Sequence, residues 1–286
     1  MFLAGNNLDE SFCMPSILAI LAACLTLSLP AAAATLRLES GVESLSFDSS
    51  ELLQHPEAAE IEIAADPAYR QPRRYRAVPL ASLLSRLAPP EDSALETVAL
   101  DGYAAQIPLR AVLGTGGKEG SRAWIAVEPA DAPWPAMPGK PAGTGPFYIV
   151  WERPEAGGIP TKYWTYRLST LRYVASPTAR WPMMEPDPAL PGSHPARRGL
   201  TVFVTQCLPC HRINGGGTAM LGPDLNHPMN PVEYFQPASL RRYLRDPASL
   251  RHWPDQKMPG FTEEQLPERD MESLIAYLAQ MAAQRP

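Results

Sequence analysis

With 286 residues, the chain is long enough for two domains of ordinary size. Its hydrophobic fraction of 45% is that of a folded soluble protein, and its formal charge of −5 gives no reason to expect a nucleic-acid partner. The 33 prolines argue against one long helical bundle and favour loops and a linker.

The first 34 residues are interpreted as a secretory signal peptide. An apolar run at residues 17–29 is followed by small residues, and cleavage is expected after Ala33 or Ala34. The run is short for an uncleaved membrane span. We therefore expect a periplasmic or otherwise exported protein, with no membrane span in its mature form.

Two features of this segment leave alternatives open. No Lys or Arg precedes the apolar run, so Met14 is an alternative to Met1 as the true start. Residues 21–24 also look like a lipoprotein cleavage box, which would anchor the chain through Cys24. The anchor ranks second because the apolar run continues past Cys24. Removal of the segment leaves only Cys207 and Cys210, so no other disulfide can form.

Residues 35–175 are predicted to form a β-rich domain. Apolar and polar residues alternate in short runs, and Asp101-Gly102 is a pair typical of hairpin turns. Strands are expected near residues 36–38, 45–47, 61–63, 98–100, 107, 124–127, 147–151, 163–168 and 171–174, with short helices at 49–54 and 80–87. The Pro/Gly-rich loop 128–145 is interpreted as either a binding element or a mobile segment.

The order of these elements resembles the oxidoreductase molybdopterin-binding domain of the sulfite-oxidase type. The matching stretches are residues 47–53, 78–84, 101–103 and 166–174. In that family a cysteine thiolate binds molybdenum, and the resemblance implies its place near residues 65–68. No cysteine lies between Thr35 and Gln206, and Asp66 is a poor replacement for a soft thiolate. We therefore expect the fold without the activity, and no bound molybdopterin.

Four arginines follow that position closely: Arg70, Arg73, Arg74 and Arg76. They could bind an anionic pterin phosphate or an acidic patch on a partner. A solvated loop is the favoured interpretation, because most runs of charge are simply exposed.

Residues 176–196 are predicted to be a linker between two domains. Six prolines in this stretch argue against a helix or a central strand and favour an extended, semi-rigid chain. Such a linker would keep the second domain within reach of the first without setting one orientation. Met183 and Met184 lie in it, and a linker without packing is a poor place for a metal ligand.

The most informative motif is Cys207-Leu208-Pro209-Cys210-His211. Two cysteines three residues apart, with histidine directly after the second, match the attachment signature of a covalent haem. On a helix these three side chains share one face, so the thiols can bond to the haem vinyl groups while the imidazole binds iron. A redox disulfide or half of a zinc site is the alternative.

Residues 197–286 are predicted to form an all-α domain around this motif. Leu200, Phe203, Val204 and Cys207 follow helical spacing into the motif. Further helices are expected at residues 238–245 and from about Pro267 to the apolar stripe that ends near residue 282.

This region resembles the class I cytochrome c family. The family's spacing is present as Gly199-x3-Phe203-x3-Cys207, its Gly-Pro-x-Leu as residues 222–225, its Met-Pro loop as 257–261 and its aromatic-Leu pair as 277–278. The resemblance implies that the Pro223 carbonyl orients His211 and that Gly199 packs against Tyr277. It also implies that His211 and Met258 are the two axial ligands of one haem c.

Chemistry also supports Met258, because a neutral thioether favours ferrous iron and two filled axial positions favour electron transfer. The rival ligands are Met220, Met229, His227 and His252. Arg251 and Trp253 are candidates to meet the haem propionates, or they are ordinary surface residues.

The sequence thus predicts an α+β two-domain protein that carries electrons. A periplasmic dehydrogenase, a terminal oxidase or another cytochrome is the expected partner. Two alternatives remain: an oxidoreductase in which the first domain binds a pterin or substrate and the haem is its outlet, and a haem sensor or docking module.

Overall fold

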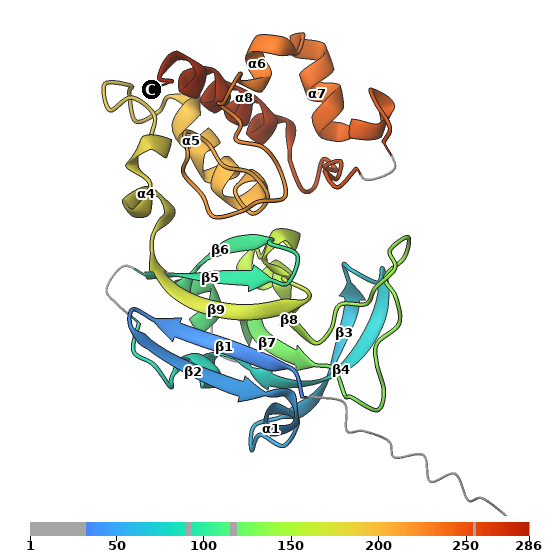
Figure 1. Cartoon of the computed structure of the whole chain (residues 1–286). Helices are drawn as coiled ribbons and strands as arrows, with labels where there is room; N and C mark the ends of the chain where they lie inside the picture. The colour runs from blue at the N-terminus through green and yellow to red at the C-terminus, as the bar shows by residue number, and fades with distance from the viewer. Residues whose placement is uncertain (1–32, 90–92, 115–118, 254–255, 286) are drawn as a thin grey trace, which may run out of the picture. The chain divides into compact units, whose positions relative to one another are not determined.

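The computed structural model describes residues 33–89, 93–114, 119–253 and 256–285. The predicted signal peptide lies almost wholly outside these residues, as do Met14 and Cys24. A β-rich region and then a helical region follow one another within the unit formed by residues 33–286 (Figure 1). Among the described residues, no helix combines the length and apolar content that crossing a bilayer requires.

Two sheets make up the β-rich region in the described part of the chain. The first has the strand order β2-β1-β9-β5-β6, in which β1 pairs with β9 in parallel and the other neighbours are antiparallel. Its strands are β1 (Thr35–Ser40), β2 (Glu43–Asp48), β5 (Ser93–Ala99), β6 (Ala104–Pro108) and β9 (Leu168–Ala175).

The second sheet is antiparallel, with the order β3-β4-β7-β8. Its strands are β3 (Ala59–Asp66), β4 (Gln71–Pro79), β7 (Arg122–Val127) and β8 (Phe147–Glu152). Short helices follow three of the strands: α1 (Ser49–Leu53), α2 (Leu80–Leu84) and α3 (Leu109–Leu113). The single turns η2 (Pro154–Gly157) and η3 (Thr161–Tyr163) lie between β8 and β9.

Alternating sequence explains the outer strands, and apolar sequence explains the inner ones. In β1, Leu36 and Leu38 are fully buried while Arg37 between them is exposed. In β8 every residue from Phe147 to Trp151 is buried, so both faces of this strand are covered. Burial of such large side chains contributes about 1.5–3 kcal/mol each, and it makes the two sheets one core.

Two local expectations for the β-rich region were wrong. Residues 163–168 do not form a strand: η3 and an isolated bridge between Tyr148 and Tyr166 precede β9. The arginines do not form a loop, because Arg73, Arg74 and Arg76 lie in β4. There they face Ile63, Glu62 and Glu60 of β3, and opposite charges across a strand pair explain the sequence.

The long loop at residues 128–145 is tied to the sheets. The Tyr69 hydroxyl donates to the Pro135 carbonyl at 3.0 Å and accepts from the Thr144 amide at 3.1 Å. Glu128 accepts from the Trp134 amide at 2.6 Å. These bonds hold both ends of the loop, so its length does not indicate a free segment.

The expectation that residues 176–196 hold no helix was also wrong. Helix α4 (Pro177–Arg180) and the turn η4 (Pro182–Met184) occur there, because each begins with a proline where a helix tolerates one. Met184 is fully buried in the core of the helical region, and its carbonyl accepts from the Tyr277 hydroxyl at 2.8 Å. This stretch is therefore folded and packs against the helical region.

The helical region comprises α5 (Pro195–Val202), the π-helical turn η5 (Phe203–Cys207), α6 (Pro231–Tyr234), α7 (Pro237–Arg245), the turn η6 (Pro247–Ser249) and α8 (Glu268–Ala283). Helix α8 buries the predicted stripe, including Met271, Leu274 and Leu278. Helices α5 and α8 pack directly on each other (Figure 1).

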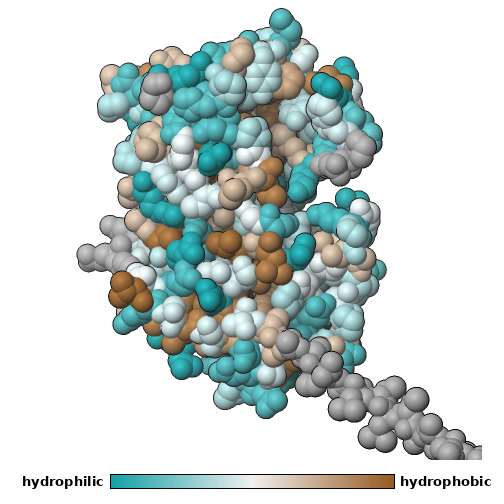
Figure 2. All heavy atoms as spheres, viewed as in Figure 1, coloured by the Kyte–Doolittle hydropathy of each residue, from teal (hydrophilic) through white to brown (hydrophobic). Residues whose placement is uncertain are grey.

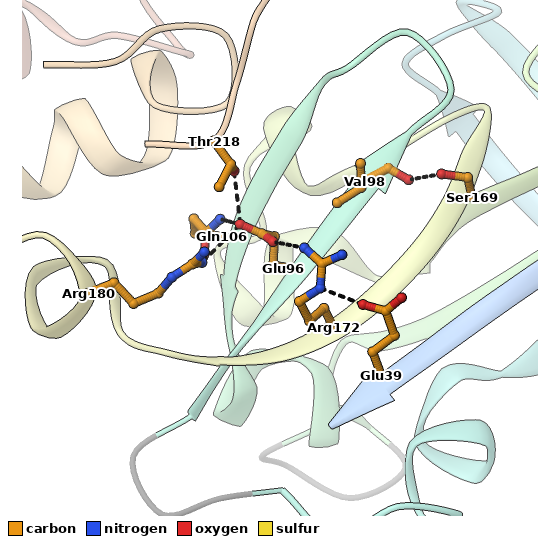
Figure 3. A network of polar contacts seen from close by, with 8 residues as sticks. All are labelled: Glu39, Glu96, Val98, Gln106, Ser169, Arg172, Arg180 and Thr218. Carbon is orange, nitrogen blue, oxygen red and sulfur yellow. Dashed lines mark hydrogen bonds and ion pairs between the residues drawn. The ribbon is translucent and has the colours of Figure 1, made fainter. Parts of the chain in front are cut away.

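A buried carboxylate joins several elements (Figure 3). Glu96 of β5 is fully buried and accepts from Arg172 of β9 at 2.8 Å and Arg180 of α4 at 2.9 Å. Gln106 of β6 and Thr218 of the helical region also donate to it, at 2.7 and 3.0 Å. Burial alone would raise the pKa of Glu96, but these donors outweigh it and hold the pKa below its usual value.

Unlike the buried cores, the face of the molecule drawn in Figure 2 shows no large continuous apolar area. Hydrophilic side chains cover most of that face, and hydrophobic ones lie in separate small groups among them. Scattered apolar residues of this kind are ordinary on a folded protein.

Candidate functional site: a cavity at the CxxCH motif

A cavity of about 500 Å³ lies in the helical region beside the CxxCH motif. Its walls are mostly apolar and come from α7, α8 and the chain between them, with Leu240, Leu244, Leu274, Leu278 and Phe261 among the lining residues. The predicted residues Cys207, Cys210, His211, Pro223 and Met258 all line this one cavity.

The helix leading to the motif widens as it reaches Cys207. Helix α5 gives way to η5, and the last turn is closed by bonds from the Cys210 and His211 amides to the Cys207 carbonyl, at 3.0 and 2.8 Å. This turn brings both sulfurs and the imidazole to the same cavity. A wider turn of this kind often marks a functional site, since it re-aims side chains.

No disulfide joins Cys207 to Cys210, and both sulfurs lie in a poorly hydrated place. Cys207 is 8% exposed, and burial raises the pKa of its thiol to about 12. Burial likewise raises the pKa of Cys210. Because a thiolate is the reactive form in disulfide exchange, this setting disfavours the redox-disulfide alternative. Neutral thioethers carry no charge to desolvate and suit it better.

Within the described residues, no group of three or more His, Cys, Asp or Glu side chains is placed to hold a metal ion. A structural zinc site needs four such ligands. The cysteine pair with His211 therefore lacks the partners that the zinc interpretation requires in this part of the chain.

His211 is held in one orientation by the Gly222-Pro223 turn. Its Nδ1 atom lies 2.9 Å from the Pro223 carbonyl oxygen, the contact that the family resemblance implied. Burial lowers the pKa of the imidazole, so the neutral form that binds metals is favoured. With the Nδ1 proton donated to Pro223, Nε2 is left as the lone-pair nitrogen for a metal.

Gly222 is required beside the ring. The amide of Gly222 donates to the Cys210 carbonyl at 2.7 Å, and a Cβ atom there would lie 2.4 Å from Cε1 of His211. No side chain fits without displacing the imidazole. The Gly-Pro pair thus combines space for the ring with a carbonyl that orients it.

Met258 is half-buried and packs against the core of the helical region. It lines the same cavity as His211, on the loop that follows Trp253. The loop is anchored at Gly260, where a Cβ atom would lie 2.2 Å from the Arg245 carbonyl oxygen, and at Phe261, whose amide donates to Leu244. The end of α7 therefore sets the position of the loop.

Gly199 lies behind the motif. A Cβ atom on Gly199 would lie 2.0 Å from the Ser273 carbonyl oxygen and 2.5 Å from Cβ of Tyr277, so α5 and α8 cross at this glycine. Phe203 packs on Tyr277 with ring centroids 5.4 Å apart. The predicted pair Gly199 and Tyr277 serves the helix crossing, while neither lines the cavity.

The rival iron ligands are placed elsewhere. Met220 is 84% exposed and Met229 is 49% exposed, and neither lines the cavity. His227 and His252 are exposed, and they too are absent from its walls. Trp253 does line the cavity, whereas Arg251 does not and instead stacks on Trp253 at 3.8 Å.

Several lining residues were missed by the sequence analysis. Three of them are aromatic and form a row of tilted rings. The ring centroids of Tyr234 and Phe235 lie 4.8 Å apart, those of Phe235 and Tyr243 lie 5.1 Å apart, and all three line the cavity. The density of aromatic residues around α6 was a usable signal. Lys162 also lines it but belongs to the β-rich region, and no local pattern points to that.

The position of the expected molybdenum thiolate has a different role. Asp66 is 1% exposed, and its carboxylate accepts from the Ala68 and Tyr69 amides and the Tyr75 hydroxyl, at 2.8, 3.0 and 2.7 Å. The carboxylate closes the turn between β3 and β4. With its oxygens committed to these donors, Asp66 is unsuited to bind a metal.

Three of the four neighbouring arginines make separate contacts. Arg74 pairs with Glu62 at 2.9 Å, Arg76 donates to the Leu53 carbonyl at 3.3 Å, and Arg73 stacks on the Tyr69 ring at 4.6 Å. These contacts spread the guanidinium groups over different neighbours. They give no support to a shared phosphate site.

The comparisons with known proteins bear on the helical region. Residues 196–282 match the family model Cytochrome c. This part of the chain is therefore a cytochrome c domain, a haem-binding module of electron transfer, and the cavity at the CxxCH motif is its expected haem site. The match does not extend to the β-rich region, whose likeness to the sulfite-oxidase type stays a prediction. No curated protein matches the chain.

Proposed function

We propose that the chain is an exported electron carrier with one c-type haem. Cys207 and Cys210 would form the thioether bonds, and His211 and Met258 would be the axial ligands. The observation that carries the proposal is the convergence of these four side chains on one mostly apolar cavity. Export rests on the predicted signal peptide, since c-type haem is attached outside the cytoplasm in bacteria.

Each part of the site has a role in this proposal. The two sulfurs tether the group, and the Pro223 carbonyl keeps His211 in one tautomer and orientation. The apolar walls exclude water, which lowers the polarity around any metal centre. When bound, the haem supplies a one-electron couple, and histidine–methionine ligation raises its potential.

Covalent attachment is the first test. In a host that attaches haem c, the wild-type chain should keep haem through a denaturing gel, as seen by haem staining. Cys207→Ala with Cys210→Ala should lose all covalent haem, because no other cysteine follows the signal peptide. A colourless wild-type protein with two free thiols would contradict the proposal.

The second test concerns the axial ligand. Met258→Ala should abolish the weak far-red sulfur-to-iron absorption and lower the reduction potential, because a soft neutral ligand of ferrous iron is removed. Met220→Ala is the matched control, because Met220 is exposed and outside the cavity. Loss of the band in the control instead would move the ligand to Met220.

A second candidate function has one observation in its favour. A smaller cavity lies beside Pro67 and Ala68 in the β-rich region, so this region has space for a small molecule whose electrons the haem would carry away. A pterin-bound metal fits poorly, because Asp66 is committed to local donors. Iron and molybdenum analysis of the purified protein separates a molybdenum oxidoreductase from the carrier: molybdenum beside iron would favour the oxidoreductase, and iron alone would remove that form of it.

A haem sensor needs an open position at iron. Because Met258 lines the predicted haem cavity, it is available to fill that position. Ready binding of CO by the ferrous protein would favour the sensor, and slow or absent binding would favour the carrier.

A further inference from the structure

The smaller cavity, of about 270 Å³, shares a wall with the predicted haem cavity. Lys162, Pro259 and Phe261 line both cavities. The remaining walls of the smaller one come mainly from the β-rich region, and they include Tyr103, Tyr148, Trp164 and Tyr166. No feature of the proposed electron carrier uses this space.

Its walls are built from aromatic faces. Tyr148 and Trp164 have ring centroids 6.2 Å apart, Tyr148 and Tyr166 have centroids 6.5 Å apart, and Tyr148 and Trp164 are buried. Aromatic walls favour a planar apolar body, because rings gain from offset or edge contacts. The shape of the lining therefore suits one small aromatic ring.

The charge of the lining is positive on one side. The Lys162 ammonium lies 5.1 Å from the centre of the Phe261 ring, and no carboxylate among the described residues pairs with it. The backbone of Lys162 is held by the Tyr103 hydroxyl, which donates to its carbonyl at 2.6 Å. The Lys162 ammonium thus extends from an anchored backbone and has no paired carboxylate in the described part of the chain, which suits it to an anion.

A second lysine reinforces this field. The Lys140 ammonium donates to the Tyr166 hydroxyl at 2.6 Å and lies 4.7 Å from the centre of that ring. Asp101 is the acidic residue in the lining, and it accepts from the Tyr103 amide at 3.2 Å. Lys162 is the cation in the lining, while Asp101 in the lining and Asp66 behind it are bonded to neighbouring amides and hydroxyls, so the Lys162 ammonium is the group left to meet a negative charge.

We propose that this cavity binds a small aromatic monoanion, with its ring between Tyr148, Trp164 and Phe261 and its carboxylate on Lys162. The binding itself is independent of the proposed function. Any effect of the ligand on the haem rests on that function, because it acts through the shared residues Lys162 and Phe261.

The test titrates the holo-protein with benzoate and with its neutral isostere benzamide, using calorimetry and tryptophan fluorescence. Benzoate should bind saturably, and at least about tenfold more tightly than benzamide, because only the anion gains a charge-assisted bond. Lys162→Met should remove this preference, and Lys162→Arg should retain part of it.

Lys257→Met is the control, because it deletes the same charge from the haem cavity and not from this one. It should leave the preference for benzoate intact. The far-UV circular dichroism of each variant checks that it is folded. Tyr148→Phe removes only a hydroxyl group from the wall of the smaller cavity and is therefore a milder change than the loss of a charge.

Three results would overturn the proposal: no saturable binding of benzoate, equal binding of benzamide, or an unchanged preference in Lys162→Met. A colourless protein that still binds benzoate would instead refute the electron carrier and leave this site standing. The two hypotheses therefore fail separately.

Discussion

The two regions satisfy their buried polar groups in different ways. In the helical region the buried groups are neutral: Asn226 donates to the Asn214 side chain and the Met281 carbonyl at 2.6 and 2.8 Å, and Asn230 donates to Asn226 and Leu278 at 2.9 and 3.0 Å. In the β-rich region the buried polar groups include, beside neutral hydroxyls and an amide, the carboxylates of Glu96 and Asp66, each with several donors.

This difference follows what each region has to hold. The side-chain amides of Asn226 and Asn230 hold the loop at residues 214–230 against α8. Carboxylates in the sheets join elements that lie far apart in the sequence, since one acceptor pair can bind several donors. The cavity walls can therefore stay apolar while ionic anchors serve elsewhere.

The largest expected effect comes from removing the charge of Glu96. Glu96→Gln should lower the free energy of unfolding by about 3–5 kcal/mol, because Arg172 and Arg180 lose their shared buried partner. Urea unfolding followed by circular dichroism measures the loss. Glu39→Gln is the control, since its partly exposed ion pair with Arg172 should cost about 1 kcal/mol or less. Equal losses would contradict the idea that burial makes the Glu96 carboxylate an anchor of the β-rich region.

A smaller effect is expected at the helix crossing. Gly199→Ala should cost about 1–3 kcal/mol, because its methyl group would overlap the Ser273 carbonyl and push α5 from α8. Gly192→Ala is the control, because nothing lies within 4 Å of the added carbon. Thermal melting of both variants provides the measurement. A loss as large in Gly192→Ala would contradict the idea that close contact at the helix crossing causes the effect, since Gly→Ala in open space should be neutral or slightly stabilising.

The smallest expected effect is on pH dependence. The pKa of Glu96 is lowered on folding, so its stabilising contribution is complete above its usual value of about 4.5 and is lost as pH falls through the lower folded value. Wild type should therefore lose stability more steeply than Glu96→Gln below about pH 4.5. Parallel unfolding curves from pH 3 to 7 would contradict this role for Glu96.

The elements that the sequence predicted well are those with a short repeat. Alternation in β1 and the helical stripe of α8 depend on residues two to four apart, and both match the burial observed. The stretch at residues 163–168 looked like a strand because it is aromatic, but its rings line the smaller cavity instead. Local propensity does not show which partner strand is available.

Residues 176–196 differ from the extended linker that their prolines predicted. Pro177 and Pro182 each begin a short helical turn. Burial of Met184 and the bond from Tyr277 hold this stretch on the helical region. These contacts depend on α8, which lies about a hundred residues away, so the local sequence could not reveal them.

The sequence alone determined the CxxCH motif and the Gly222-Pro223 turn that orients His211. The proposed covalent attachment would need Cys207, Cys210 and His211 on one turn and Gly222-Pro223 within a short loop, and all of these are set by local spacing in the sequence. Tertiary structure alone decided the partners of Glu96, the role of Asp66 and the second cavity. The physical reason is distance along the chain: Thr218 lies 122 residues from Glu96, and only the packed sheets and helices bring such groups together.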